Sequence, residues 1–79
     1  MEKVIELRGL IYGKYATESQ LADELGWSKQ RLNLITNGKR EPDLEEVAAL
    51  AEKLDKSVED MVYLFLRHKS PNRQRYQTA

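Results

Sequence analysis

No cysteine occurs in the 79 residues, histidine occurs once, and 13 basic and 13 acidic side chains leave a formal net charge of zero. Without cysteine the chain has no disulfides and no thiolate metal ligands, which is compatible with a reducing compartment. No apolar run approaches the roughly 20 residues of a membrane-spanning helix. The first residues, MEKVIELRG, carry acids where a signal peptide has an apolar region. We therefore expect one small cytoplasmic domain without a membrane segment.

Little in the sequence supports catalysis. The single histidine, His68, has no cysteine, serine or carboxylate at a spacing that would make a catalytic pair. A glycine-rich phosphate loop and a cluster of metal ligands are also missing. We expect no enzymatic activity, no cofactor, no metal and no small-molecule substrate.

Charge is segregated along the chain although it sums to zero. Residues 27–40 contain four cations and no acid, and residues 41–60 contain eight acids against two lysines. From residue 67 onward there are again four cations and no acid. This distribution favours an anionic partner for the two basic stretches. The alternative is that surface charge clusters by chance. The zero net charge argues separately against a protein that binds nucleic acid without sequence preference.

The stretch TESQLADELGWSKQRLNLITNGK predicts two short helices joined by a tight turn. Thr17 and Gln20 have the spacing of a capping box at the start of the first helix. Gly26 lies where the chain must reverse, and it suits this turn because glycine adopts the left-handed conformation without steric cost. Ser28 is placed to cap the second helix, and the Asn-Gly pair at 37–38 ends it. Helix, glycine turn and helix at this size are typical of a helix-turn-helix.

Three further helices are expected around this pair. The first spans residues 2–15, the next is opened by a capping box of Asp43 and Glu46, and the last is capped by Ser57. Trp27, in the turn, is interpreted as a core anchor, with ligand stacking as the alternative. The stripes expected to face inward are Val4, Leu7 and Ile11; Leu21, Ala22 and Leu25; Leu32 and Ile35; Leu44, Val47, Ala48, Ala51 and Leu54; and Val58, Met61, Val62 and Phe65.

The predicted fold is all-α, a bundle of five helices over residues 1–66. Residues 67–79 lack periodicity and contain Pro71, so they predict a basic tail that is disordered in isolation. Its cations, which include Arg73 and Arg75, either add contacts to phosphate or merely solubilise the domain. A third possibility is that the tail folds back onto the acids of residues 41–60.

The order and spacing of several motifs resemble the phage-repressor (Cro-like) helix-turn-helix family over roughly residues 4–65. The matching pieces are Leu21-Ala22, Gly26, the polar helix from Ser28 to Ile35, and Asn37-Gly38-Lys39 through Pro42. The resemblance implies a lambda-repressor-like bundle that binds double-stranded DNA. It also implies that the helix from Ser28 to Thr36 enters the major groove.

The chain departs from the family pattern at four positions. Glu18 stands where the family usually has a glutamine that helps hold a phosphate, and a carboxylate there suits the helix dipole but repels phosphate. Ile11 and Thr36 replace an arginine and a glutamate that often pair, which we interpret as an ion pair exchanged for less polar packing. Leu34 occupies a position that is often polar and faces the bases.

Residues near the start of a recognition helix reach base edges. The expected base contacts are Ser28, Lys29, Gln30, Asn33 and Leu34. Gln30 has the groups to pair with adenine, Lys29 to read guanine and Leu34 to touch a thymine methyl group. Asn33 could reach a base or a phosphate. For each polar residue the alternative is a solvated helix face, and for Leu34 it is exposed packing. The expected phosphate contacts are Thr17, Arg31, Asn37, Lys39 and Arg40.

The last helix carries more apolar surface than one stripe needs. Tyr63, Leu64 and Leu66 lie outside the predicted inward stripe, so they either meet a second subunit or sit deeper in the core. We expect a homodimer on DNA that uses these three residues. The predicted function is sequence-specific DNA binding by a repressor-type regulator of phage, mobile-element or antitoxin kind. The alternative is a protein-interaction module that keeps the fold without specific DNA binding.

Overall fold

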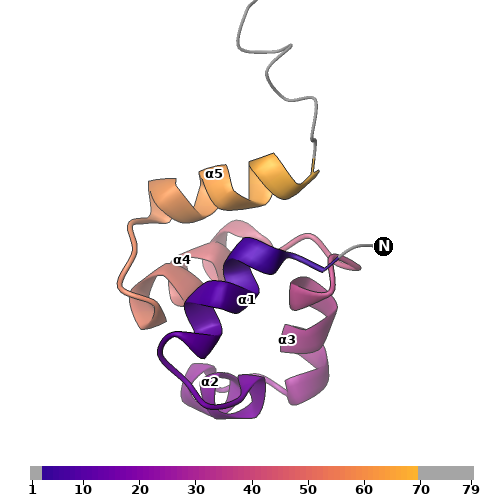
Figure 1. Cartoon of the computed structure of the whole chain (residues 1–79), viewed down its shortest axis with the longest axis vertical. Helices are drawn as coiled ribbons and strands as arrows, with labels where there is room; N and C mark the ends of the chain where they lie inside the picture. Colours follow the sequence, from indigo (N-terminus) through magenta and orange to yellow (C-terminus); the bar gives the residue numbers. More distant parts are fainter. Residues whose placement is uncertain (1–2, 70–79) are drawn as a thin grey trace, which may run out of the picture.

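The computed structural model describes residues 3–69, which form five helices and no strand (Figure 1). The all-α prediction is confirmed. The first helix, predicted over residues 2–15, is shorter than expected at both ends. The helices are α1 (Ile5–Tyr12), α2 (Glu18–Leu25), α3 (Lys29–Thr36), α4 (Leu44–Lys53) and α5 (Val58–Lys69).

Helix α4 links α5 to the first helix of the motif. It packs against α5 on one side and α2 on the other, and α1 contacts both α2 and α3. In Figure 1, α5 covers one end of the bundle, α2 lies at the opposite end, and α3 runs along one side. The N-terminal segment joins the end of α3, because the Val4 amide donates to the Thr36 carbonyl at 2.8 Å. The two helices of the motif are therefore braced from the N-terminal side as well.

The core follows the predicted stripes with five exceptions. Leu44, Ala48 and Val58 are exposed, whereas Leu50 and Leu64, which lie outside the predicted stripes, are buried. Leu44 and Val58 are the first residues of α4 and α5, where the neighbouring helices no longer cover the stripe. The buried apolar side chains are Val4, Leu7, Ile11, Leu21, Ala22, Leu32, Ile35, Val47, Leu50, Ala51, Leu54, Met61 and Leu64.

The predicted helix caps form, with one change of register. The Thr17 hydroxyl accepts from the Gln20 amide at 3.2 Å, as expected. The Gln20 side-chain oxygen accepts from the Ala16 amide at 3.0 Å. In the expected capping box the donor is the amide of Thr17, one residue later. Gly26 has φ +76°, and a Cβ added there would meet open space, so the backbone angle alone requires glycine. Ser57 accepts from the Asp60 amide at 3.0 Å and caps α5.

Helix α5 runs to Lys69, three residues past the predicted boundary at Leu66. Its last turn is held to α1, since Arg67 donates to both carboxylate oxygens of Glu6 at 3.2 and 2.8 Å. Residues 67–69 therefore belong to the helix rather than to the predicted tail. The rest of that tail, residues 70–79 with Arg73 and Arg75, lies outside the described residues.

Candidate nucleic-acid interface

Helix α3 has one buried side and one exposed side. Leu32 and Ile35 are fully buried and Thr36 is 1% exposed, so these three residues fix the side that meets the core. The predicted base contacts lie away from it. Ser28, Lys29 and Gln30 are exposed in the first turn, Leu34 is 39% exposed, and Asn33 is half-buried.

The first turn of α3 is held in a defined position by its cap. Gly26 ends α2 in the left-handed conformation, and the Trp27 amide closes the turn by donating to the Ala22 carbonyl at 2.9 Å. The Ser28 hydroxyl then accepts from the Arg31 amide at 3.1 Å. This cap satisfies one of the amides left free at a helix start, and it leaves Lys29 and Gln30 pointing out from an ordered turn.

A concave surface of about 290 Å³, which we call the α1–α3 concavity, joins residues from three helices. It brings together four of the predicted contacts: Lys29, Asn33 and Asn37 from α3 and its C-cap, and Thr17 from the start of α2. Gln30, Leu34 and Lys39 do not line it. The remaining lining residues are Arg8, Tyr12, Glu18 and Ser19.

Sequence reasoning did not find the contribution of α1 to this concavity. Arg8 lies over the Tyr12 ring, with 5.8 Å between the guanidinium carbon and the ring centroid. The two residues are four apart and therefore neighbours on the helix surface. Leu7 and Ile11 are fully buried, which turns Arg8 and Tyr12 toward the concavity. The spacing of Arg8 and Tyr12 is visible in the sequence, but the apolar stripe of this helix predicts only a contact with the core.

The Glu18 carboxylate lies inside the protein. Glu18 is 8% exposed, and it accepts hydrogen bonds from the Thr36 hydroxyl at 3.0 Å and the Tyr12 hydroxyl at 3.4 Å. Its charge therefore sits beneath the concavity, and the first turn of α2 stabilises it there. Ile11 is fully buried, as the loss of the family ion pair suggested, but Thr36 keeps a polar contact at its position.

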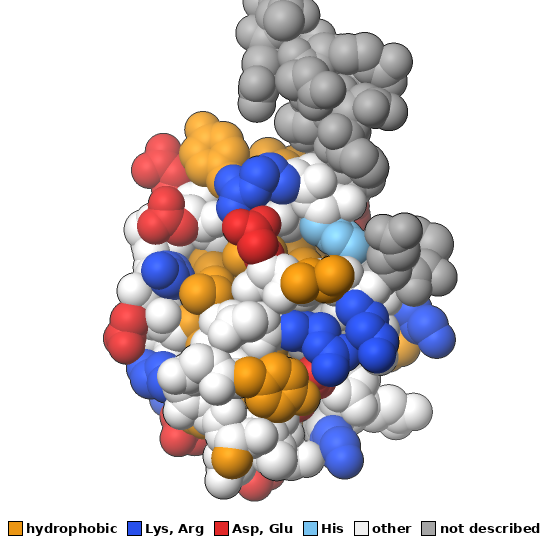
Figure 2. All heavy atoms as spheres, viewed as in Figure 1, with side chains coloured by type: hydrophobic (Ala, Val, Ile, Leu, Met, Phe, Trp, Pro, Cys, Tyr) orange, Lys and Arg blue, Asp and Glu red, His pale blue; other side chains and the backbone are white. Residues whose placement is uncertain are grey.

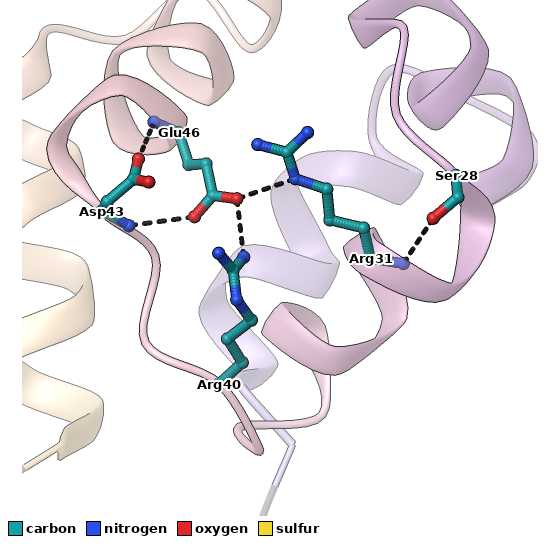
Figure 3. Close-up of polar contacts among 5 residues, drawn as sticks. All are labelled: Ser28, Arg31, Arg40, Asp43 and Glu46. Carbon is teal, nitrogen blue, oxygen red and sulfur yellow. Dashed lines mark hydrogen bonds and ion pairs between the residues drawn. The ribbon is translucent and has the colours of Figure 1, made fainter.

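Two predicted phosphate contacts meet on the other side of α3, at Glu46 (Figure 3). Arg31 donates from Nε at 2.8 Å and Arg40 from Nη1 at 2.6 Å, both to the same carboxylate oxygen. The Arg31 guanidinium also lies over the Trp27 ring at 4.5 Å. Trp27 itself is half-buried and packs against the core. The sequence predicted Glu46 as a helix cap but gave no signal for its two arginine partners.

Cations gather at α3 in the assembled molecule. Figure 2 shows a contiguous group of Lys and Arg side chains over this helix, whereas the acidic side chains on the same face lie mainly along the opposite edge. The predicted cations Lys29, Arg31, Lys39 and Arg40 are all exposed. The segregation along the sequence is thus also a segregation in space, which gives α3 a locally positive surface on a neutral protein.

The three predicted dimer residues lie in different surroundings. Leu64 is 4% exposed and belongs to the core, so it is not available to a second subunit. Tyr63 is 55% exposed, and Leu66 is half-buried in an apolar groove of about 420 Å³. This groove between the α3–α4 loop and α5 is also lined by Pro42, Leu44 and Phe65.

Within residues 3–69, no helix is both long enough and apolar enough to cross a membrane. No group of three or more histidine or acidic side chains in this range is arranged to hold a metal ion.

The fold and the presentation of α3 define a small all-α helix-turn-helix domain. A family model described as Helix-turn-helix, of the Cro/C1 type, matches residues 17–61. The chain therefore belongs to this family of DNA-binding domains, whose members are generally transcription regulators. No curated protein and no solved structure matches the chain.

Proposed function

We propose that this protein is a repressor-type regulator that recognises a specific duplex sequence through the first turn of α3. The observation that carries the proposal is the exposure of Ser28, Lys29 and Gln30 on a capped turn whose opposite side is fully buried. Side chains on such a turn reach base edges in the major groove. The cations Arg31, Lys39 and Arg40 flank the turn and supply phosphate contacts. Regulators of phage, mobile-element or antitoxin kind fit this size and family.

A selection from genomic fragments at two salt concentrations tests the proposal. The wild-type chain is expected to enrich one sequence at both concentrations, because base contacts depend less on salt than phosphate contacts do. Lys29→Ala and Gln30→Ala should each weaken binding to that sequence by about 1–3 kcal/mol and relax the base preference. Lys56→Ala, an exposed lysine in the α4–α5 connection, is the matched control. Equal losses on selected and random DNA would show that Lys29 and Gln30 touch only phosphate.

The second candidate function is a protein-interaction module. It is supported by the formal net charge of zero and by the Glu18 carboxylate beneath the α1–α3 concavity, which lowers the attraction for phosphate. A chain that enriches no DNA sequence at either salt concentration would favour this candidate over the regulator.

We also propose that the protein binds DNA as a homodimer through the apolar groove. Leu44 is 70% exposed and lines this groove together with Phe65 and Leu66. A protruding side chain and a groove on one face are self-complementary, as a two-fold interface requires. Pairing would place two α3 helices on half-sites about 34 Å apart. From the sequence-predicted set, Leu66 takes part, Leu64 does not, and Tyr63 lies outside the groove lining.

Sedimentation with and without DNA tests the dimer. Two chains are expected on each duplex that carries both half-sites, and Leu44→Glu should reduce this to one without unfolding the monomer. Tyr63→Glu is the control, because Tyr63 is exposed on α5 but does not line the groove. One wild-type chain on each duplex would contradict the proposed dimer.

A further inference from the structure

The buried carboxylate of Glu46 connects the recognition helix to the rest of the fold. Glu46 is 1% exposed and lies in the first turn of α4. One of its oxygens accepts from the Asp43 amide at 2.9 Å, and the Asp43 carboxylate accepts from the Glu46 amide at 2.8 Å. This reciprocal cap fixes Glu46 from its own helix, so its second oxygen has a defined place in space.

That second oxygen holds two arginines from different segments. Arg31 belongs to α3, and Arg40 belongs to the loop that leads from α3 to α4. As Figure 3 shows, both side chains converge on one oxygen, while the other faces Asp43. A single buried atom therefore joins the recognition helix, the loop after it and the start of α4.

The arginines compensate the charge of Glu46. Burial by itself raises the pKa of this carboxyl, but hydrogen bonds from Arg40, the Asp43 amide and Arg31 outweigh burial, and the net pKa is lowered. Glu46 is thus ionised at neutral pH, and the group of Arg31, Arg40 and Glu46 carries a net charge of +1. The two arginine side chains remain 43% and 38% exposed.

Arg31 is held from two directions. Its Nε edge faces Glu46 and its flat face lies over Trp27 at 4.5 Å. The backbone amide of Arg31 also donates to the Ser28 hydroxyl that caps α3. Arg31 directly follows Gln30 in the sequence. The residue whose side chain Glu46 holds therefore belongs to the capped turn that carries Ser28, Lys29 and Gln30.

We infer that Glu46 is a positioning residue for DNA recognition. By holding Arg31 and Arg40 it fixes the first turn of α3 relative to α4, and it presents the exposed parts of both guanidinium groups to backbone phosphates beside the recognised bases. Phosphate contacts set the register in which base contacts are read. This inference rests on the proposed function and assigns part of the sequence preference to a residue that touches no DNA.

Glu46→Gln separates positioning from charge. The variant removes one negative charge beside the interface, so charge alone predicts tighter binding to every duplex. Positioning predicts the opposite for the selected duplex, because a neutral amide holds two guanidinium groups more weakly than a carboxylate does. Glu45→Gln is the matched control, since Glu45 is the exposed neighbour on the same helix turn and its loss changes the charge equally.

The measurement is fluorescence anisotropy of the full chain on the selected duplex and on a scrambled one. We expect Glu46→Gln to lower the preference for the selected duplex by about tenfold, the size of one base contact. Binding to the scrambled duplex should stay equal or become tighter. Glu45→Gln should leave the preference unchanged. If Glu46→Gln behaves as Glu45→Gln does, the inference is overturned.

Arg31→Lys is a second variant, which tests the inference even if Glu46→Gln fails to fold. Lysine keeps the charge of Arg31 but has no Nε edge and no planar group to lie over Trp27. Positioning predicts a lower sequence preference and a changed Trp27 emission, whereas charge alone predicts neither. Unchanged preference and emission would also overturn the inference. If the wild-type chain prefers no duplex, the proposed function fails as well; if it discriminates and both variants discriminate equally, only the inference fails.

Discussion

Two buried glutamates flank the recognition helix, and they are held in different ways. Glu18, in the first turn of α2, accepts from the hydroxyl groups of Thr36 and Tyr12. Glu46, in the first turn of α4, accepts from the guanidinium groups of Arg31 and Arg40. The first contacts the last residue of α3 and the second contacts its first turn, so one carboxylate braces each end of the helix.

The two glutamates show two ways to compensate the lost hydration of a buried carboxylate. An ionised carboxylate that leaves water loses its hydration, and the protein must replace it. At Glu46 two cations replace it, which leaves a net positive group at the surface of the interface. At Glu18 only neutral hydroxyls and the start of a helix replace it, so its negative charge remains under the α1–α3 concavity. Glu46 should therefore favour both stability and DNA binding, whereas Glu18 should favour stability and, through its charge, oppose phosphate binding.

The largest effect is expected from Glu46→Ala. It removes half of the capping box and leaves Arg31 and Arg40 without their shared acceptor, so unfolding should become easier by about 2–3 kcal/mol. Chemical denaturation at neutral pH measures this. Glu45→Ala, on the exposed side of the same turn, should cost far less. Equal costs for the two variants would mean that the buried contacts of Glu46 add nothing.

Thr36→Val should cost less, about 1–2 kcal/mol, because a buried carboxylate then loses a neutral donor. Valine keeps the shape of threonine, and the backbone contact from the Val4 amide to residue 36 remains. The same denaturation experiment measures the change. A cost equal to that of Glu46→Ala would remove the distinction between cationic and neutral partners.

The pH dependence of stability distinguishes Glu46 further. The lowered pKa of Glu46 means that its contribution is fully present above its ordinary pKa of 4.5 and is lost as the pH falls through the lowered value. Wild type should therefore exceed Glu46→Gln by about 1 kcal/mol in unfolding free energy near pH 7, because glutamine still accepts hydrogen bonds but loses the part of their strength that the charge adds. This gap should close in acid. Denaturation series from pH 7 down to pH 3 measure it, and a gap that is constant with pH would contradict the assignment.

The smallest effect is expected from Tyr12→Phe, at most about 0.5 kcal/mol. The Tyr12 hydroxyl is 3.4 Å from Glu18, at the long end for such a bond, and Tyr12 is 48% exposed. Thermal unfolding measures the change, with Tyr63→Phe as the control for loss of an exposed phenol. A loss larger than that of Thr36→Val would make Tyr12 the main partner of Glu18.

The sequence by itself determined the local structure. The caps at Thr17, Ser28 and Asp43 and the turn at Gly26 were predicted correctly because each depends on a few neighbouring residues and their backbone angles. The buried side of α3 was equally predictable, since Leu32 and Ile35 can face the core together in only one orientation of the helix.

Only the tertiary structure decided which distant side chains meet. Glu46 reaches Arg31 across 15 residues, Glu18 reaches Thr36 across 18, and Arg8 joins the α1–α3 concavity from a helix that the motif does not include. For the same reason Leu44, predicted to face inward, is exposed, and Leu64, predicted to lie outside the inward stripe, is buried. Periodicity gives the direction of a side chain around its own helix, but the angle and offset at which two helices pack determine what that side chain touches.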